Sequence, residues 1–218
     1  IKSDNKLNDL STSSQPFSLS ELEKERYSDN GLAVVLEKIS GVNTLSTGNK
    51  VSKPVIHGMF GSRVGIFYNG VMLENQQWGQ DHAPNIDLNA FDRIRVIKGA
   101  SVLKYSGSNP GGIIIIDSKA PKTIDTLYGK TIINALSNGR GGSIISSLTN
   151  SSQSGKYLKS QITIKKSGDL SSPNYLLSNT ASNEKNISIT GGKNFTKGNI
   201  KLFLSYFNTE IGILKSSH

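Results

Sequence analysis

The chain has 218 residues, of which 35% are hydrophobic, 7% aromatic and 19% charged. Apolar usage is below the ~45% of a typical soluble domain. No apolar run approaches the ~20 residues that a transmembrane helix needs. The chain has no cysteine, which excludes a disulfide framework, a thiolate nucleophile and a zinc ribbon. Periodic Val, Ile and Leu residues along the whole chain argue against wholesale disorder.

The net charge of +9 is unevenly distributed. Residues 1–122 hold 14 basic and 12 acidic side chains, whereas residues 123–218 hold 11 basic and 4 acidic ones. The basic residues of the second half are spaced among Ser, Asn and Thr, with no cluster longer than Lys165-Lys166. Nucleic-acid binding favours a continuous basic stripe with stacking aromatics. We therefore expect scattered, solvated lysines and no nucleic-acid partner.

The first half predicts a small α+β domain. Ser18–Arg26 has the pattern of a short capped helix. Asn30 can cap a second helix with an apolar face from Leu32 to Ile39, which Gly41 would end. Strands are expected at residues 54–57, 63–68, 93–98 and 112–117, with a short helical turn at 100–105. Because the run Ile113–Ile116 is β-branched and bounded by glycines, we expect it to form a central strand buried on both faces.

The second half has no helical period. Polar and apolar residues alternate in five segments, at residues 131–136, 142–148, 158–165, 186–191 and 199–206. Gly/Asn turn signals separate them, and this is the pattern of a transmembrane β-barrel wall, although a soluble antiparallel sheet has a similar one. In the last segment, the pattern places Ile200, Leu202, Leu204 and Tyr206 on one face and Lys201, Phe203 and Ser205 on the other.

Four pieces of the first half resemble one family. Residues 32–42 are similar to the helix followed by small-Gly-Val that opens the plug domain of TonB-dependent outer-membrane receptors. The other three are Pro54–Gly58 with Arg63-Val64 and Asn69–Val71, then Ile86-Asp87 with Phe91–Ser101, then Tyr105–Gly107 with Gly111–Ile115. The chain departs from the family pattern by having His57 for Arg, Asn69 for Asp, Arg95 for an acid, Ala100 for Pro and Tyr-Ser-Gly for Tyr-Gly-Ser.

The resemblance implies an α+β plug domain with a small mixed sheet at residues 1–122, followed by the first antiparallel barrel strands at residues 123–218. It also implies a bacterial outer-membrane location and energised uptake of a metal ion or metal complex. The implied partners are a TonB-type protein on the periplasmic side, the membrane lipid and the remainder of the barrel. Family barrels have about 22 strands, and an open set of strands cannot sit in lipid. We therefore expect the chain to be a fragment or one piece of a longer protein.

The segment Gln76–Pro84 contains the most distinctive side chains. Asp81 and His82 are adjacent in a Gly/Pro-bounded loop and offer a carboxylate oxygen and an imidazole nitrogen to one cation. In the family this loop lies at the plug apex, and the pair resembles that of zinc and haem receptors. The metal candidates are therefore Zn²⁺ or an iron complex as bound substrate, with no resident cofactor. The alternative is that Asp81 caps a turn and His82 bonds a neighbour.

Three further residues are candidates for substrate contact. Trp78 and Gln80 flank the Asp-His pair, and Trp78 either stacks on a ligand ring or packs under the loop. His57 is expected in a strand, where it either contacts substrate or is packed and hydrogen-bonded. The chain lacks a Gly-x-Ser-x-Gly elbow and a phosphate loop, so we expect no enzyme activity. A surface-exposed, adhesin-like β-rich module without transport remains the alternative function.

Overall fold

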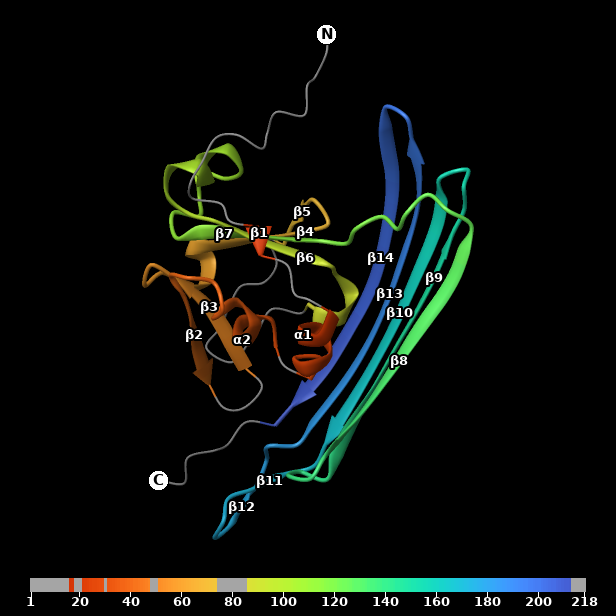
Figure 1. Cartoon of the computed structure of the whole chain (residues 1–218). Helices are drawn as coiled ribbons and strands as arrows, with labels where there is room; N and C mark the ends of the chain where they lie inside the picture. Colours follow the sequence, from red (N-terminus) through yellow and green to blue (C-terminus); the bar gives the residue numbers. More distant parts are fainter. Residues whose placement is uncertain (1–15, 18–20, 30, 48–50, 74–85, 213–218) are drawn as a thin grey trace.

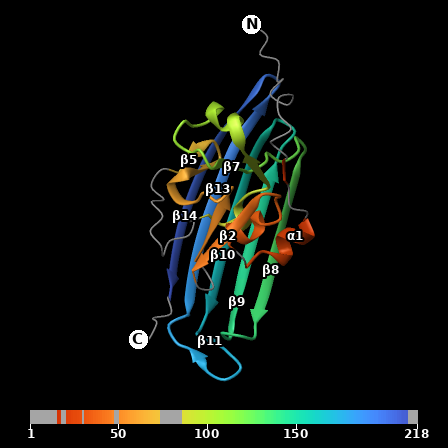
Figure 2. The ribbon, with the colours of Figure 1, turned by 90° about the vertical axis from the view of Figure 1, so that its left-hand side faces the viewer.

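The chain folds into an α+β body and a wall of five long strands that lie side by side (Figures 1 and 2). The computed structural model describes residues 16–17, 21–29, 31–47, 51–73 and 86–212. The body contains the elements from β1 to β7, and the wall contains those from β8 to β14. The described helices include none that is long and apolar enough to cross a membrane.

The second helix of the body is shorter than the sequence pattern predicts, whereas residues 18–20 of the first predicted helix lie outside the described residues. Helix α1 spans Glu21–Arg26 and helix α2 spans Leu32–Leu36. Gly31 is the N-cap of α2, without a side-chain hydrogen bond. The chain leaves α2 at Glu37 in tight turns, and Gly41 follows with a φ of 76°, which favours glycine. The predicted stop at Gly41 therefore marks the end of these turns rather than the end of the helix.

A mixed five-stranded sheet forms the centre of the body. Its strands, in spatial order, are β1 (Pro16–Phe17), β6 (Arg93–Ile97), β7 (Gly112–Asp117), β4 (Val64–Tyr68) and β5 (Val71–Met72). Strand β7 pairs antiparallel with β6 and parallel with β4. A separate antiparallel hairpin consists of β2 (Val42–Thr47) and β3 (Val51–Ile56). The described part of the body also contains the 3₁₀ turns η1 (Gly61–Arg63), η2 (Leu88–Ala90) and η3 (Gly99–Lys104).

Strand β7 confirms the predicted central strand. Ile114 and Ile116 are fully buried in the larger apolar cluster of the body, whereas Ile113 and Ile115 belong to a smaller cluster on the other face. Successive side chains of a strand point to opposite faces, so this one run holds both layers together. Gly112 precedes the run with a φ of 147°, and a Cβ there would lie 2.9 Å from Ile56 Cδ1.

The wall is an antiparallel sheet in which neighbours in sequence pair in space. Its strands are β8 (Thr126–Leu136), β9 (Gly141–Ser151), β10 (Lys156–Ser167), β13 (Ser182–Phe195) and β14 (Gly198–Ile211). They are 11 to 14 residues long, enough for a tilted strand to cross a bilayer. The short pair β11 (Leu170–Ser171) and β12 (Leu176–Leu177) lies in the connection between β10 and β13.

The two faces of the wall differ in polarity, as the alternation predicts. On β14 the exposed side chains of Ile200, Leu202, Leu204 and Tyr206 lie on the face directed away from the body, and Phe203 packs against the body's core. Leu158, Ile162 and Ile164 continue the apolar band on β10. We call this the outer face and the opposite one the inner face.

Replacing Ile115 with Asp should unfold the body. The side chain is 5% exposed in the smaller apolar cluster, and an unpaired buried charge costs several kcal/mol. Circular dichroism and limited proteolysis of the full-length protein would measure this. Leu103→Asp is the matched control, because Leu103 is 74% exposed and should tolerate the charge. Equal stability of the two variants would contradict the prediction.

Arginine scanning at adjacent positions of β10 should distinguish the two faces of the wall. Ile162→Arg places a charge on the outer face and should cost ~2–4 kcal/mol if that face contacts hydrocarbon. Gln161→Arg points to the inner face, where the side chain borders a cavity, and should be tolerated. Urea titration of the folded protein in lipid vesicles measures both free energies. A cost at Gln161 that matched the cost at Ile162 would refute the assignment of faces.

Candidate functional site

Four of the five predicted site residues cannot be placed. Trp78, Gln80, Asp81 and His82 lie outside the described residues. Across the ranges that the structure describes, no three His, Cys, Asp or Glu residues form a group that could hold a metal ion. The predicted metal contact of Asp81 and His82 therefore stays a prediction.

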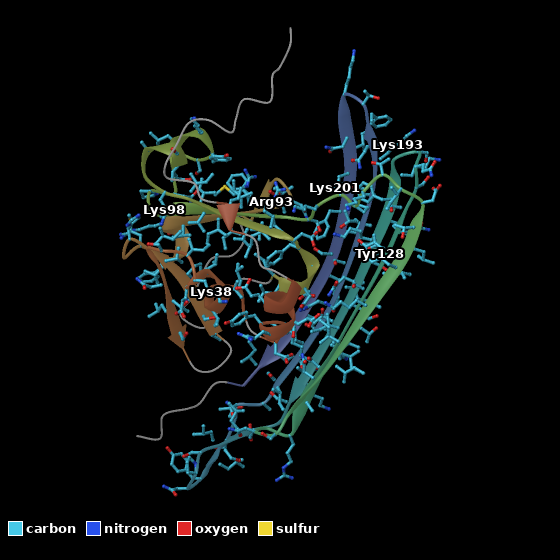
Figure 3. All side chains as sticks on the ribbon, in the orientation of Figure 1. Lys38, Arg93, Lys98, Tyr128, Lys193 and Lys201 are labelled. Atoms are coloured by element: carbon cyan, nitrogen blue, oxygen red, sulfur yellow. The ribbon has the colours of Figure 1, made fainter. Side chains whose placement is uncertain are left out.

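His57 is described, and its predicted position in a strand is wrong. Strand β3 ends at Ile56, and His57 lies in the following turn, exposed and with a φ of 49°. The alternating pattern failed here because Gly58, also with positive φ, turns the chain at this point. A Cβ built on Gly41 would lie 3.9 Å from His57 Cε1 and 3.1 Å from Lys98 Nζ. Figure 3 shows Lys98 on the side of the body away from the wall, and His57 lies near the same glycine as Lys98.

The site that the structure does assemble is the interface between the body and the inner face of the wall. Small polar side chains cover much of this face: Ser143, Ser147, Thr149, Thr163, Asn186, Ser188 and Thr190 are at most intermediate in exposure. Four lysines also point inward from the wall, namely Lys130, Lys159, Lys165 and Lys201. A polar inner face can hold a folded domain without the dry packing of a hydrophobic core, so the body can stay a separate unit.

Lys159 of β10 forms the central contact between wall and body. Its Nζ donates to Asp92 Oδ2 at 2.7 Å and to the Lys119 carbonyl at 3.3 Å. The same Asp92 oxygen accepts the Lys119 backbone N–H at 3.0 Å. Because Lys119 is the second residue of the connection from β7 to β8, this network fixes the chain close to the point where it leaves the body for the wall.

Two more contacts attach the first helix region to strand β8. Lys130 pairs with Glu25 of α1. Asn134 donates to Ser28 Oγ at 3.1 Å, and Ser28 is 1% exposed. Lys165 instead pairs within the wall, with Glu184 of β13 at 3.3 Å. Three of the four inward lysines thus have a carboxylate partner.

Lys201 of β14 differs from the other three. Its Nζ donates to Asn69 Oδ1 at 2.8 Å, and the described residues offer it no carboxylate. Figure 3 shows Lys201 reaching from β14 toward the body. Beside it, the Phe203 ring meets the Tyr68 ring edge to face at 4.9 Å between centroids. Burial, with the Asp87 carboxylate as a smaller cause, raises the pKa of the Tyr68 phenol, which therefore stays neutral in this apolar contact.

A cavity of about 560 Å³, lined by both polar and apolar groups, lies between the body and strands β8 to β13. The body lines it with Asn89, Ala90, Asp92 and Ser118. The wall contributes hydroxyl and amide groups together with Tyr128, Lys130 and Lys159. The hydrogen-bonding groups of this lining are of the kind that hold buried water molecules.

A second, open hollow of about 920 Å³ lies where β8–β9 and β10–β13 are connected. Its lining includes Arg140, Lys166 and Asp169. Backbone N–H groups of Thr180 and Ala181 donate to Asp169 Oδ1 at 2.7 and 2.9 Å, and the Thr180 bond is the main cause that lowers the pKa of this carboxyl. The ionised Asp169 carboxylate should therefore stabilise the loop at neutral pH. This stabilisation should be lost only as the pH falls through the lowered pKa.

The inward lysines are the functional residues that sequence reasoning missed. We expected the lysines of the second half to be scattered and solvated, and for Lys159 and Lys165 this is wrong, since both are largely buried. The alternation along the strand could have indicated this. It places Lys159 and Lys165 on the same face as Gln161 and Thr163, opposite Ile162 and Ile164. What the period could not supply was the partner on the body.

Comparison with known proteins shows which proteins share this architecture. Residues 6–113 match the family model of the TonB-dependent Receptor Plug Domain. Among solved structures, the chain resembles the copper transporter OprC with a TM-score of 0.72 and 20% identity over 84% of this chain and 28% of that one. It also resembles the siderophore receptor PirA from Pseudomonas aeruginosa, with a TM-score of 0.65 and 16% identity over 92% of this chain and 34% of that one.

A third similar structure is the FrpB iron transporter from Neisseria meningitidis, with a TM-score of 0.68 and 12% identity over 90% of this chain and 31% of that one. The chain thus spans about a third or less of the length of these structures. Their descriptions name copper, a siderophore and iron, so they do not single out zinc or haem. TonB-dependent receptors are bacterial outer-membrane transporters and not enzymes. Residues 6–113 are therefore a TonB-dependent receptor plug domain, and the antiparallel strands that follow have the fold of part of such a receptor's barrel.

Proposed function

We propose that the chain is the plug and first wall section of a receptor that takes up a metal ion or metal complex across the bacterial outer membrane. In this proposal the plug spans residues 1–122 and the barrel strands begin in residues 123–218. A TonB-type protein energises the plug from the periplasmic side, and further strands close the barrel around it. The docking of the plug on the inner face of the wall, through Lys159 and Asp92, is the observation that carries the proposal.

The way in which plug and wall meet supports transport over a purely structural role. Among the described residues, their contacts are ion pairs and single hydrogen bonds around a cavity, together with the aromatic pair Tyr68–Phe203. Such contacts are individually weak when partly exposed, so a pulled plug can leave them one at a time. A wall that only supported a rigid module would gain more from apolar packing at the same positions.

For the substrate, we propose a transition-metal cation or a haem or siderophore iron complex that meets Asp81 and His82, with Trp78 and Gln80 beside them. The adjacent carboxylate and imidazole suit Zn²⁺ and other borderline metals, and the similar structures add copper and iron–siderophore complexes to the candidates. His57 lies in an exposed turn after β3. It is the weakest member of the proposed substrate set.

Uptake by cells tests this function. The full-length receptor, expressed in a bacterium without receptors of its own for these metals, should import one of labelled zinc, copper, haem or ferric enterobactin. Import should stop when an uncoupler removes the inner-membrane proton gradient, because the plug is moved by work from that membrane. Surface binding without energised import of any of the four would favour the adhesin-like alternative.

Asp81→Ala and His82→Ala should each weaken metal binding by the intact receptor. Ligation requires neutral imidazole, so the affinity of the unmodified receptor should fall as pH drops through the ordinary imidazole pKa near ~6.5. Calorimetric titration with Zn²⁺ and Cu²⁺ measures the loss. His57→Ala should have the smallest effect of the three, because His57 is not part of the proposed carboxylate–imidazole pair. Unchanged affinity in both Asp81→Ala and His82→Ala would contradict metal binding by this pair. It would favour the alternative in which Asp81 caps a turn and His82 bonds a neighbour.

The Lys159–Asp92 pair should contribute measurable docking energy. In a double-mutant cycle with Lys159→Gln and Asp92→Asn, we expect a coupling of about 1 kcal/mol, because the side chains are only 22% and 27% exposed. Urea-induced release of the plug, followed by protease sensitivity, reports it. The Lys38–Glu23 pair lies within the plug and should give no coupling in the same release assay. Zero coupling for Lys159 and Asp92 would contradict the proposed docking contact.

A further inference from the structure

The turn between β4 and β5 places an asparagine amide in an unusual environment. Asn69 and Gly70 form this two-residue turn, both with positive φ, at 49° and 86°. Asn69 Oδ1 accepts two hydrogen bonds, from the Ser118 backbone N–H at 3.0 Å and from Lys201 Nζ at 2.8 Å. Both partners can only donate, so they fix which end of the amide is the oxygen.

The nitrogen end of the same amide is unsupported. Asn69 Nδ2 is buried, and within the described part of the chain it has no hydrogen-bond partner. The amide is therefore held by its oxygen alone. Such a buried, unpaired donor destabilises the amide relative to a carboxylate in the same position, which would have no donor to satisfy.

We propose that Asn69-Gly70 is a self-deamidation site, in which the Lys201 ammonium and the Ser118 N–H act together as an oxyanion hole. Two donors aimed at a carbonyl oxygen stabilise the negative charge that develops when a nucleophile attacks the carbon. The nucleophile is the Gly70 backbone nitrogen, and the absence of a side chain on Gly70 leaves the approach to Asn69 Cγ unhindered. Gly70 N–H donates no hydrogen bond to the described residues that would have to be broken first.

The reaction needs only water as co-reactant. The Gly70 nitrogen bonds to Asn69 Cγ and loses its proton, and the bond from Cγ to Nδ2 breaks, so that ammonia leaves and a succinimide ring remains. Water then adds to Cγ, the new bond to the Gly70 nitrogen breaks, and that nitrogen regains a proton. Because Cγ is the carbonyl whose oxygen the two donors hold, water should add there and give aspartate in preference to isoaspartate.

The product would change the contact between plug and wall. Aspartate at position 69 has two acceptor oxygens and no donor, so the unpaired Nδ2 disappears. Lys201, which lacks a carboxylate among the described residues, would gain one at hydrogen-bond distance. Lys130, Lys159, Lys165 and Lys201 would then each have a carboxylate partner, and the modified plug would be held more firmly than the newly made one.

The chain contains a matched internal control. Asn138-Gly139 is another Asn-Gly pair in a turn, between β8 and β9. Asn138 bonds at both ends of its amide to the Ser171 backbone, with Oδ1 accepting at 2.7 Å and Nδ2 donating at 3.0 Å. No lysine contacts its oxygen in the described structure. Its leaving nitrogen is held and its carbonyl is less polarised, so it should react more slowly in the folded protein.

The experiment follows both sites by peptide mass spectrometry during incubation of the folded full-length protein, with enzymatic labelling to separate isoaspartate from aspartate. Asn69 should convert faster than Asn138 and mainly to aspartate. Lys201→Gln should lower the deamidation rate of Asn69 about tenfold. Removing one donor from an enzyme's oxyanion hole has a larger effect, about 100- to 1000-fold. Lys201→Arg should retain most of the rate, and Lys193→Gln, which changes a lysine beside Phe195, should leave it unchanged.

In denaturant the two sites should react at similar rates, and the effect of Lys201→Gln should vanish. This arm separates the oxyanion hole from a change of folding, because loss of docking by Lys201→Gln would free the turn and speed the reaction rather than slow it. A rate at Asn138 equal to or above that at Asn69 in the folded protein overturns the proposal. So does an unchanged or faster rate in Lys201→Gln, or a product that is mainly isoaspartate.

Discussion

Each wall strand must present two chemically different faces, and the rest of the structure follows from this constraint. Because successive side chains alternate, β10 displays Leu158, Ile162 and Ile164 outward while Lys159 and Thr163 point inward. The outer face can then meet lipid, and the inner face can hold a polar partner. A slip of one residue in register would exchange the two faces. The register of the wall strands therefore also determines which side chains face the plug.

The plug meets this wall as a folded body with its own core, and not as an extension of the wall's packing. Strand β7 supplies apolar side chains to both sides of the plug sheet, so the plug gains its stability internally. The contacts outward are sparse and mostly polar: Lys159 with Asp92, Lys130 with Glu25, and Lys201 with Asn69. A domain that is stable by itself and lightly held by its surroundings can move as a unit or in part without loss of the barrel.

The cations of these contacts lie on the wall and the acceptors on the plug. Lys130 and Lys159 meet carboxylates, whereas Lys201 meets a neutral amide and has no carboxylate partner among the described residues. Arg95 of β6 is a different case, because its partner Asp117 lies at the end of β7 within the plug, at 3.1 Å. The unusual arginine at that position is thus balanced locally and does not add to the charge that faces the wall.

The amino-acid sequence alone determined the local elements and the two faces of the wall, because period, β-branching and turn residues act over a few neighbours. It predicted the central strand at Ile113–Ile116 and the outward set Ile200, Leu202, Leu204 and Tyr206. It did not predict that β3 ends at Ile56 and leaves His57 in a turn, since two successive residues with positive φ interrupt the alternation. Nor could it pair Lys159 with Asp92 or Lys201 with Asn69, which are 67 and 132 residues apart. Only the tertiary structure decided these contacts, because they depend on how the body docks on the wall. A local sequence pattern cannot predict a contact between residues so far apart in the chain.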